Sequence, residues 1–115
     1  MIPHLCGNVR QWIGFTVGGL PDVRDREAEF REAPGISADD LRRLLNETMS
    51  QAVAILSTLD AARLGETVWT QDGPLSVLEV VYQVVGHFQQ HTGQIVFATK
   101  LATGKDLQLY RPRKA

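Results

Sequence analysis

Residues 76–104, SVLEVVYQVVGHFQQHTGQIVFATKLATG, combine a long helical pattern with two of the three histidines of the chain. Ser76 and Glu79 have the spacing of a capping box, and Gly104 is the residue type that commonly follows the last turn of a helix. Apolar residues recur between these signals with a helical period, so we predict one long helix across this stretch. The apolar arc of this helix consists of Val77, Val81, Val84, Phe88 and Ile95.

The two histidines of this stretch, His87 and His91, lie four positions apart, so their side chains share one face of the predicted helix. Residues at this spacing are about 6 Å apart along the helix axis, and both imidazoles can therefore reach a single metal ion. The pair lies at the edge of the apolar arc, where a ligand is half buried and half accessible. The same spacing also fits two polar side chains that only make hydrogen bonds.

A third ligand would have to come from another segment, and His4 is the only other histidine. If its helix and the last helix are antiparallel neighbours, all three histidines converge. Asn8 follows His4 by one turn and could hydrogen-bond a ligand or a metal-bound water. Gln83 and Gln94 are similar candidates beside the pair. The residues alone leave a metal site and a hydrogen-bonded cluster equally open.

A second long helix is predicted within residues 35–60, GISADDLRRLLNETMSQAVAILSTLD. Ser37 is a natural N-cap, Asp40 follows three residues later, and acidic side chains fill the first turn. The inward face of this helix consists of Leu41, Leu44, Leu45, Thr48, Ala52, Ile55, Leu56 and Leu59. This amphipathic pattern indicates a helix that packs against other helices.

The first segment, PHLCGNVRQWIGFTVGG at residues 3–19, predicts a shorter helix. Pro3 suits a first helical turn and the two glycines at its end suit a stop, whereas Gly7 and Gly14 weaken the helix interior. We find no convincing strand pattern, and we interpret residues 65–73 as a loop. Residues 1–115 are therefore expected to form a single all-α domain.

The connection LPDVRDREAEFREAPG at residues 20–35 is rich in both signs of charge. Two pairs of opposite charge are spaced i,i+4, which allows a short surface helix stabilised by solvated ion pairs. The alternative is that Asp22, Arg24 or Asp25 lies at the mouth of a site.

The overall composition excludes several classes of protein. A net charge of -1 gives no electrostatic basis for binding nucleic acid, and we interpret the basic C-terminal residues 111–115 as a solvated terminus. No apolar run approaches the roughly 20 residues of a membrane span, and no signal peptide is visible. The single cysteine, Cys6, excludes an internal disulfide, fits a reducing cytoplasm and is expected to be a small buried hydrophobe.

Familiar catalytic motifs are missing from the sequence. The zincin motif H-E-x-x-H requires a glutamate where HFQQH has Phe88. The di-iron signature Glu-x-x-His is excluded because Val84 and Phe88 precede the two histidines by three residues. There is no nucleophile elbow, phosphate loop or dinucleotide fingerprint. Any hydrolysis would therefore rely on a water activated by the metal.

Three stretches taken together, HLCGNVRQWI, GGLPDVRDREAEF and HFQQHTGQIVFATKLATGKDL, resemble the DinB/YfiT-like superfamily, and in particular a bacterial branch with a PDVRDR loop. The resemblance implies a four-helix bundle with up-down-down-up topology. It also implies a divalent metal ion, Zn, Ni or Fe, held by three histidines. Carried over by position, these ligands are His4, His87 and His91.

The start of the chain departs from the pattern of the superfamily. Members similar to this sequence have a further helix before the HL motif, whereas Met1 lies only three residues before His4. We therefore expect an uncovered apolar face and self-association, in the simplest case as a homodimer. His4 is expected near a terminus that frays.

The sequence leads to two hypotheses for function. The first is a metal-binding protein of the DinB type, acting as a metal-dependent transferase with a small thiol or as a metal-dependent hydrolase; this activity is transferred by resemblance. The second is a catalytically silent helical interaction module, oligomeric and without a functional metal site.

Overall fold

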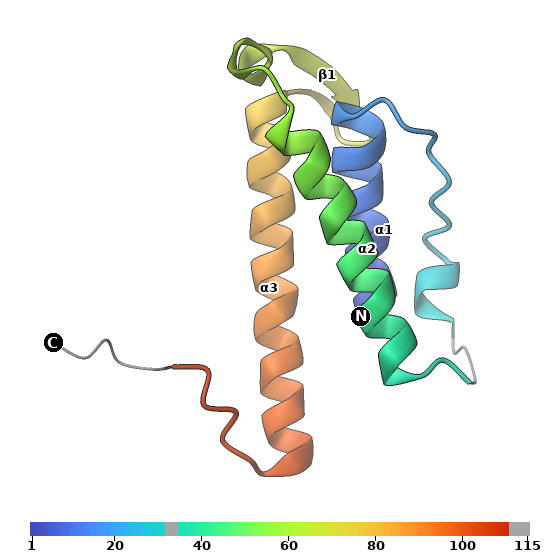
Figure 1. Cartoon of the computed structure of the whole chain (residues 1–115), viewed down its shortest axis with the longest axis vertical. Coiled ribbons are helices and arrows are strands. Elements are labelled where there is room, and N and C mark those ends of the chain that lie inside the picture. The colour runs from blue at the N-terminus through green and yellow to red at the C-terminus, as the bar shows by residue number, and fades with distance from the viewer. Residues whose placement is uncertain (32–34, 111–115) are drawn as a thin grey trace, which may run out of the picture.

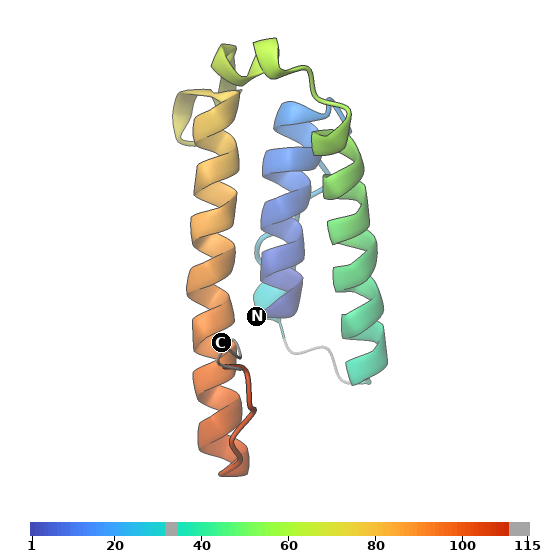
Figure 2. The same cartoon turned by 60° about the vertical axis from the view of Figure 1, so that its left-hand side comes forward.

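The fold is built from helical segments that lie side by side. The computed structural model describes residues 1–31 and 35–110 (Figure 1). Its main helical segments are α1 (Ile2–Val9), which continues as the π-helical segment η1 (Arg10–Val17), then α2 (Ala38–Ser57) and α3 (Val77–Thr103). The continuous segment of α1 and η1 runs parallel to α2, and α3 runs in the opposite direction (Figures 1 and 2).

The two long helices begin with the caps that the sequence predicts. At the start of α2, Ser37 and Asp40 form a reciprocal capping box, and Ser76 and Glu79 form another at the start of α3. Each box satisfies backbone N–H groups that have no partner within the first turn. Gly104 ends α3 in the left-handed conformation with φ 64°, where a side chain would be strained.

The first predicted helix is also present, but its second half winds more widely than an α-helix. Within η1 the hydrogen bonds span five residues, and the N–H of Gly18 still donates to the carbonyl of Ile13 at 2.9 Å. Val9, Ile13 and Val17 nevertheless all point into the core, with exposed fractions of 1–3%. The apolar spacing predicted the helix but did not distinguish its winding.

The interpretation of residues 65–73 as a loop was wrong in part. After the short 3₁₀ helix η3 (Ala61–Gly65), the chain forms an antiparallel hairpin of β1 (Thr67–Thr70) and β2 (Gly73–Ser76). The pattern was weak because each strand has only four residues and Pro74 lies in the second. Val68 and Leu75 face each other across the hairpin and pack against the core.

Residues 18–31, which follow η1, run back along the outside of the molecule (Figure 1). Because α1 and α2 are parallel, the chain must return by about the length of a helix before α2 can begin. The predicted surface helix in this connection is reduced to one 3₁₀ turn, η2 (Ala28–Phe30). This return path brings η2 next to the start of α1.

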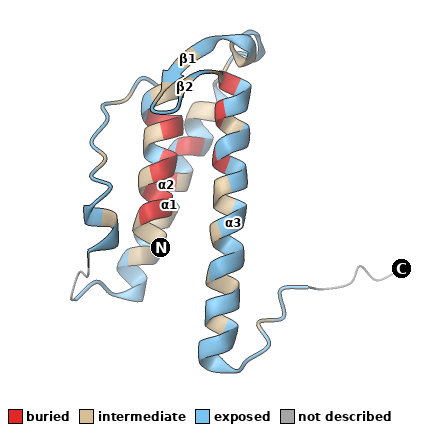
Figure 3. Ribbon diagram, turned by 180° about the vertical axis from the view of Figure 1, so that it is seen from behind, coloured by how far each residue is buried: buried red, intermediate tan, exposed pale blue. Residues whose placement is uncertain are grey.

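The buried core lies toward the hairpin end of the helices (Figure 3). It consists of Val9, Trp12, Ile13, Val17, Ala52, Val77, Val80 and Val84. Cys6 is 2% exposed and has no disulfide partner, as predicted. All residues of the predicted inward face of α2 are buried or half-buried.

The described residues thus form a mainly helical fold, consistent with the predicted helical class, with one small antiparallel sheet that the sequence did not predict. None of the helices in these two ranges is both long enough and apolar enough to cross a lipid bilayer. The basic residues 111–115, which we interpreted as a solvated terminus, lie outside the described ranges.

Candidate metal centre

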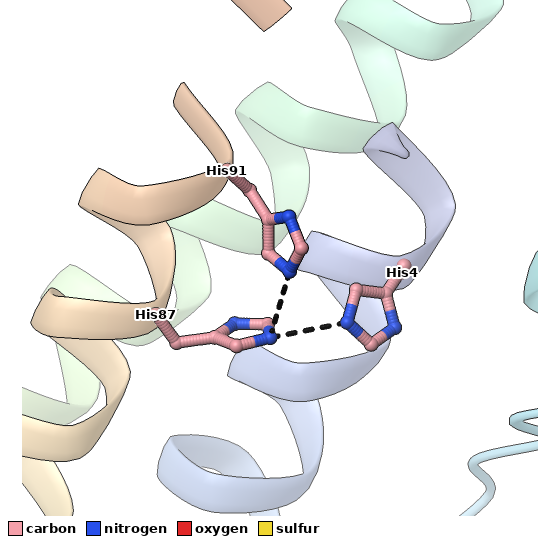
Figure 4. Close-up of side chains that lie close together, drawn as sticks. All are labelled: His4, His87 and His91. Carbon is pink, nitrogen blue, oxygen red and sulfur yellow. Dashed lines mark hydrogen bonds between the residues drawn. The ribbon is translucent and has the colours of Figure 1, made fainter. Parts of the chain in front are cut away.

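The three histidines of the chain converge between α1 and α3 (Figure 4). The Nε2 atom of His87 lies 3.1 Å from Nε2 of His4 and 3.1 Å from Nε2 of His91. The ligand atoms of the three rings all lie within 4.8 Å of one another. The antiparallel arrangement of α1 and α3 therefore brings together the residues that the sequence singled out.

The supporting hydrogen bonds determine which ring nitrogens of His4 and His91 carry a proton. Nδ1 of His4 lies 2.8 Å from Oε2 of Glu29, and Nδ1 of His91 lies 2.7 Å from Oε1 of Gln94. Carboxylate and amide oxygens only accept, so both Nδ1 atoms donate. Each of these two imidazoles, when neutral, then has a lone pair on Nε2, and both lone pairs are directed at His87.

His87 is held neutral by its surroundings. Burial lowers its pKa, and the positive charge that His91 or His4 carries when protonated and the charges of two arginines lower it further. Its Nδ1 atom is buried and has no hydrogen-bond partner among the described residues. A doubly protonated His87 would place a charge in this buried position and an unpaired N–H at Nδ1, whereas the neutral ring with its proton on Nε2 avoids both.

The spacing of the nitrogens fits a shared metal ion. Zn–N bonds of about 2.0–2.1 Å place two imidazole nitrogens roughly 3 Å apart in octahedral geometry and about 3.3 Å apart in tetrahedral geometry. Two of the three Nε2–Nε2 separations, His87 to His4 and His87 to His91, are 3.1 Å and fall in this range. Three imidazole nitrogens are also a donor set that suits Zn, Ni and Fe. The residues present therefore fit a divalent transition metal.

The surroundings of His4 differ from the expectation of a fraying terminus. His4 is 7% exposed, although it lies near the start of α1. The ring centroids of Phe30 and His4 lie 5.0 Å apart, and Glu29 accepts a hydrogen bond from Nδ1 of His4. The connection that returns to α2 therefore covers His4 and holds it in place.

The predicted supporting residues have three different outcomes. Gln94 accepts a hydrogen bond from Nδ1 of His91. Asn8 is buried on the face of His4, but its Oδ1 atom has no partner in the described part of the chain. Gln83 is exposed, and no hydrogen bond joins it to any of the three histidines.

Sequence reasoning missed the acceptor that holds His4. Burial by itself would raise the pKa of Glu29, but hydrogen bonds from Arg24 and His4 outweigh it and hold that pKa below its usual range. Glu29 is therefore a carboxylate at neutral pH. Of the charged residues considered for the mouth of a site, Arg24 contacts Glu29 directly, and Asp22 accepts from Gln11 and from the N–H of Arg24. Asp25 lies outside this network and accepts from the N–H of Ala28.

A hollow of about 760 Å³ adjoins the same network. Glu29 and Phe30, which contact His4, line one side of it, and Leu41 and Leu44 of α2 line another. The histidines themselves do not line this hollow, so it borders the supporting residues rather than the ligand atoms. Cys6 offers no reactive thiol here, because burial raises its pKa and keeps it protonated.

Comparison with protein-family models matches residues 1–113 to a family described as protein of unknown function (DUF1572). The chain belongs to this family. The DUF1572 match includes all three histidines and the connection that carries Glu29. No curated protein and no solved structure matches the chain.

Proposed function

We propose that this DUF1572 protein binds a divalent metal ion, Zn, Ni or Fe, through Nε2 of His4, His87 and His91. The convergence of these three nitrogens is the observation that supports the proposal. Two of them have lone pairs because their Nδ1 atoms donate to Glu29 and Gln94, and His87 is neutral. A neutral His87 with its proton on Nε2 can share that proton with the lone pairs of His4 and His91, and a metal ion would take the place of this proton between the three nitrogens.

We further propose that the fold is that of the DinB/YfiT-like superfamily. Two parallel helical segments followed by an antiparallel one correspond to the last three helices of an up-down-down-up bundle. The return connection after η1 corresponds to the PDVRDR loop of the resembling branch. The placement of one ligand on an early helix and two on the last helix supports the same assignment.

The activity that we propose is that of a metal-dependent transferase that uses a small thiol, or of a metal-dependent hydrolase. A divalent ion with three histidine ligands has open positions and lowers the pKa of a thiol or water that occupies one of them. His91 and His87 are only half-buried, so a small molecule can approach from their side. Glu29 is already occupied by His4 and Arg24, so it is not free to act as a base.

Metal analysis of the purified protein tests this proposal. We expect about one ion per chain in the wild type, and much less in a double variant with His87→Ala and His91→Ala, because one histidine cannot retain the ion. Gln90→Ala is a matched control, since Gln90 is exposed on the same helix between the two ligands. Equal metal content in the wild type and the double variant, with Zn²⁺ supplied, would contradict the proposal.

A second candidate function, self-association, is favoured by an apolar groove between α2 and α3. The groove has a volume of about 200 Å³, and almost all of its lining is apolar. Its walls include Met49, Val53 and Leu56 of α2 and Val81, Val85 and Phe88 of α3. Val53 and Val85 are 57% and 49% exposed, so the groove presents apolar surface to solvent, which commonly marks an interaction site.

We propose that a second copy of the chain covers this groove. The end of α3 extends beyond α1 and α2 and presents Phe97 and Leu101, one turn apart and 69% and 77% exposed (Figures 1 and 2). Each copy therefore offers both a groove and an apolar helix end, as a symmetric homodimer requires. In an interaction module without a metal site, this surface would be the functional one.

The oligomeric state tests the second candidate separately from the metal site. We expect a dimer by light scattering for the wild type and a monomer for Val53→Glu, because a charge in an apolar interface is costly to bury. Glu47→Gln is a control on an exposed position of the same helix. A wild type that stays monomeric as its concentration is raised would contradict the proposal.

A further inference from the structure

The connection between η1 and α2 places a carboxylate behind His4. Glu29 and His4 are 25 positions apart in the sequence, yet Oε2 of Glu29 accepts from Nδ1 of His4 at 2.8 Å. Both side chains are almost fully buried, with exposed fractions of 7% and 9%. Because Nδ1 donates to Glu29, the ring presents Nε2 on its opposite side, toward His87.

Arg24 holds Glu29 in turn. Its Nε atom donates to Oε1 at 2.7 Å and its Nη2 atom donates to Oε2 at 3.0 Å, which is a two-pronged pairing of guanidinium and carboxylate. Its remaining nitrogen, Nη1, donates to Gln11 on η1, the continuation of the helix that carries His4. Nη2 also approaches Nδ1 of His4 at 3.4 Å, but both are donors here and share Oε2 as acceptor.

Gly7 provides the space that the carboxylate occupies. A Cβ atom at Gly7 would lie 1.9 Å from Oε1 of Glu29 and 2.7 Å from its Cδ atom. No side chain fits there while Glu29 is in place. The glycine that weakened the predicted first helix is therefore required by a contact from outside that helix. Gly86 and Gly93 on α3, in contrast, face open space.

The three histidines are supported unequally. His91 is held by Gln94, which is exposed, and Nδ1 of His87 has no partner among the described residues. Only His4 has a buried, charged acceptor that is itself clamped. Arg24 compensates the charge of Glu29, so the carboxylate is not left unpaired in the interior.

We infer that Glu29 is a positioning residue: clamped by Arg24 and seated on Gly7, it fixes the tautomer and the ring orientation of His4 so that Nε2 faces the metal. The inference rests on the metal site proposed above. A carboxylate behind a histidine ligand fixes the imidazole and makes it a stronger donor, and loss of such a partner typically weakens metal binding about 10–100-fold.

The first test measures the tautomer of His4 in metal-free protein by nitrogen NMR. We expect the proton on Nδ1 in the wild type and in Glu29→Gln, because the amide oxygen can still accept. We expect mixed tautomers in Glu29→Ala and in Gly7→Ala, where the added methyl group displaces the carboxylate. Gly93→Ala is the matched control and should leave the tautomer unchanged. A His4 proton that stays on Nδ1 in both Glu29→Ala and Gly7→Ala would overturn the inference.

The second test measures Zn²⁺ affinity by competition with a chelator. We expect a loss of about 10–100-fold in Glu29→Ala and Gly7→Ala, a smaller loss in Glu29→Gln, and none in Gly93→Ala. Affinities in Glu29→Ala and Gly7→Ala equal to that of the wild type would overturn the inference. If Gly7→Ala does not fold, the Zn²⁺ affinity of Glu29→Ala alone decides whether the inference holds.

The two tests separate the failure of this inference from the failure of the metal site. A wild type that binds no Zn²⁺ would contradict the proposed function, and the tautomer in metal-free protein would still show whether Glu29 positions His4. A wild type that binds Zn²⁺ with unchanged affinity in the Glu29 and Gly7 variants would preserve the metal site and overturn the positioning role.

Discussion

The two halves of α3 have similar local character but different surroundings. In the upper half, residues 77–88, Val77 and Val80 are completely buried and Val84 is 8% exposed. In the lower half, residues 89–103, no side chain is buried, and Phe97 and Leu101 are more than two-thirds exposed. Helical periodicity continues through both halves, so periodicity shows where a helix can pack and not whether a neighbour is there.

The ligand pair lies at the boundary between these halves. His87 belongs to the upper half and His91 to the lower half, and both are half-buried. A ligand in the upper half is held by the packed core around it. A ligand in the lower half is accessible to a small molecule. The boundary is thus a suitable place for a metal ion with open coordination positions.

The largest expected effect comes from cutting back the core of the upper half. Val80→Ala should lower the free energy of unfolding by about 2 kcal/mol, because it removes two buried methyl groups and leaves a cavity. Leu101→Ala in the lower half should change it by less than about 0.5 kcal/mol. Urea denaturation of both variants measures the difference. Equal losses would mean that the lower half is buried in solution, as it would be in a dimer.

The pH dependence of the free energy of unfolding tests whether His87, at the boundary between the two halves of α3, is buried in the folded protein. Burial lowers the pKa of His87, so below the ordinary histidine pKa of about 6.5 the unfolded chain binds a proton that the folded chain resists. Stability of the metal-free protein should therefore fall as pH decreases below about 6.5, by at most about 1.4 kcal/mol per pH unit for one proton. Above that pH, this group should have no effect.

His87→Gln provides the comparison for this pH dependence. Glutamine does not titrate, so denaturation curves of this variant should show a shallower loss of stability in acid than those of the wild type. The same slope in both proteins would show that His87 is not the group responsible.

Substitutions at the two caps of α3 should affect stability differently, because one cap adjoins the buried half of the helix and the other the exposed half. Ser76→Ala removes a side-chain acceptor next to the buried core and should lower global stability by about 1 kcal/mol. Gly104→Ala strains the left-handed residue after the exposed end and should mainly fray the last turn. Amide hydrogen exchange along α3 distinguishes the two. Global loss of protection in Gly104→Ala would contradict this division.

The smallest effect is expected from Gly93→Ala. A Cβ atom at this position meets nothing within 4 Å, and alanine stabilises a helix interior by up to about 1 kcal/mol relative to glycine. Because the lower half is poorly packed, the gain should appear as slower hydrogen exchange around residue 93 and only slightly as global stability. A full increase in global stability would show that the two halves unfold together.

Much of the fold was predictable because its signals are local. The capping boxes at Ser37 and Ser76 and the glycine at position 104 each act within one helical turn. The inward face of α2 and the apolar arc of α3 follow from periodicity, and the structure buries or half-buries them. The hairpin was missed because short strands with a proline give little alternation.

The candidate site was predictable only in part. His87 and His91 share a helix face by spacing alone, and Gln94 lies one turn from His91, so both contacts are local. Glu29 gave no comparable signal, because its contact with His4 depends on the path of a connection with little regular structure. Gly7 did not point to this contact by itself, because Gly86 and Gly93 are also interior helix glycines and face open space.

Helix boundaries, inward faces and the histidine pair are properties of residues within a turn of one another, and the amino-acid sequence contains them directly. The contacts of His4 with His87 and with Glu29 are not local, because His4 lies 83 positions from His87 and 25 positions from Glu29. Those contacts exist because α1 runs antiparallel to α3 and parallel to α2, and the second relation forces the connection to return past His4. The directions of packed helices depend on the whole core, and they appear only in the folded chain.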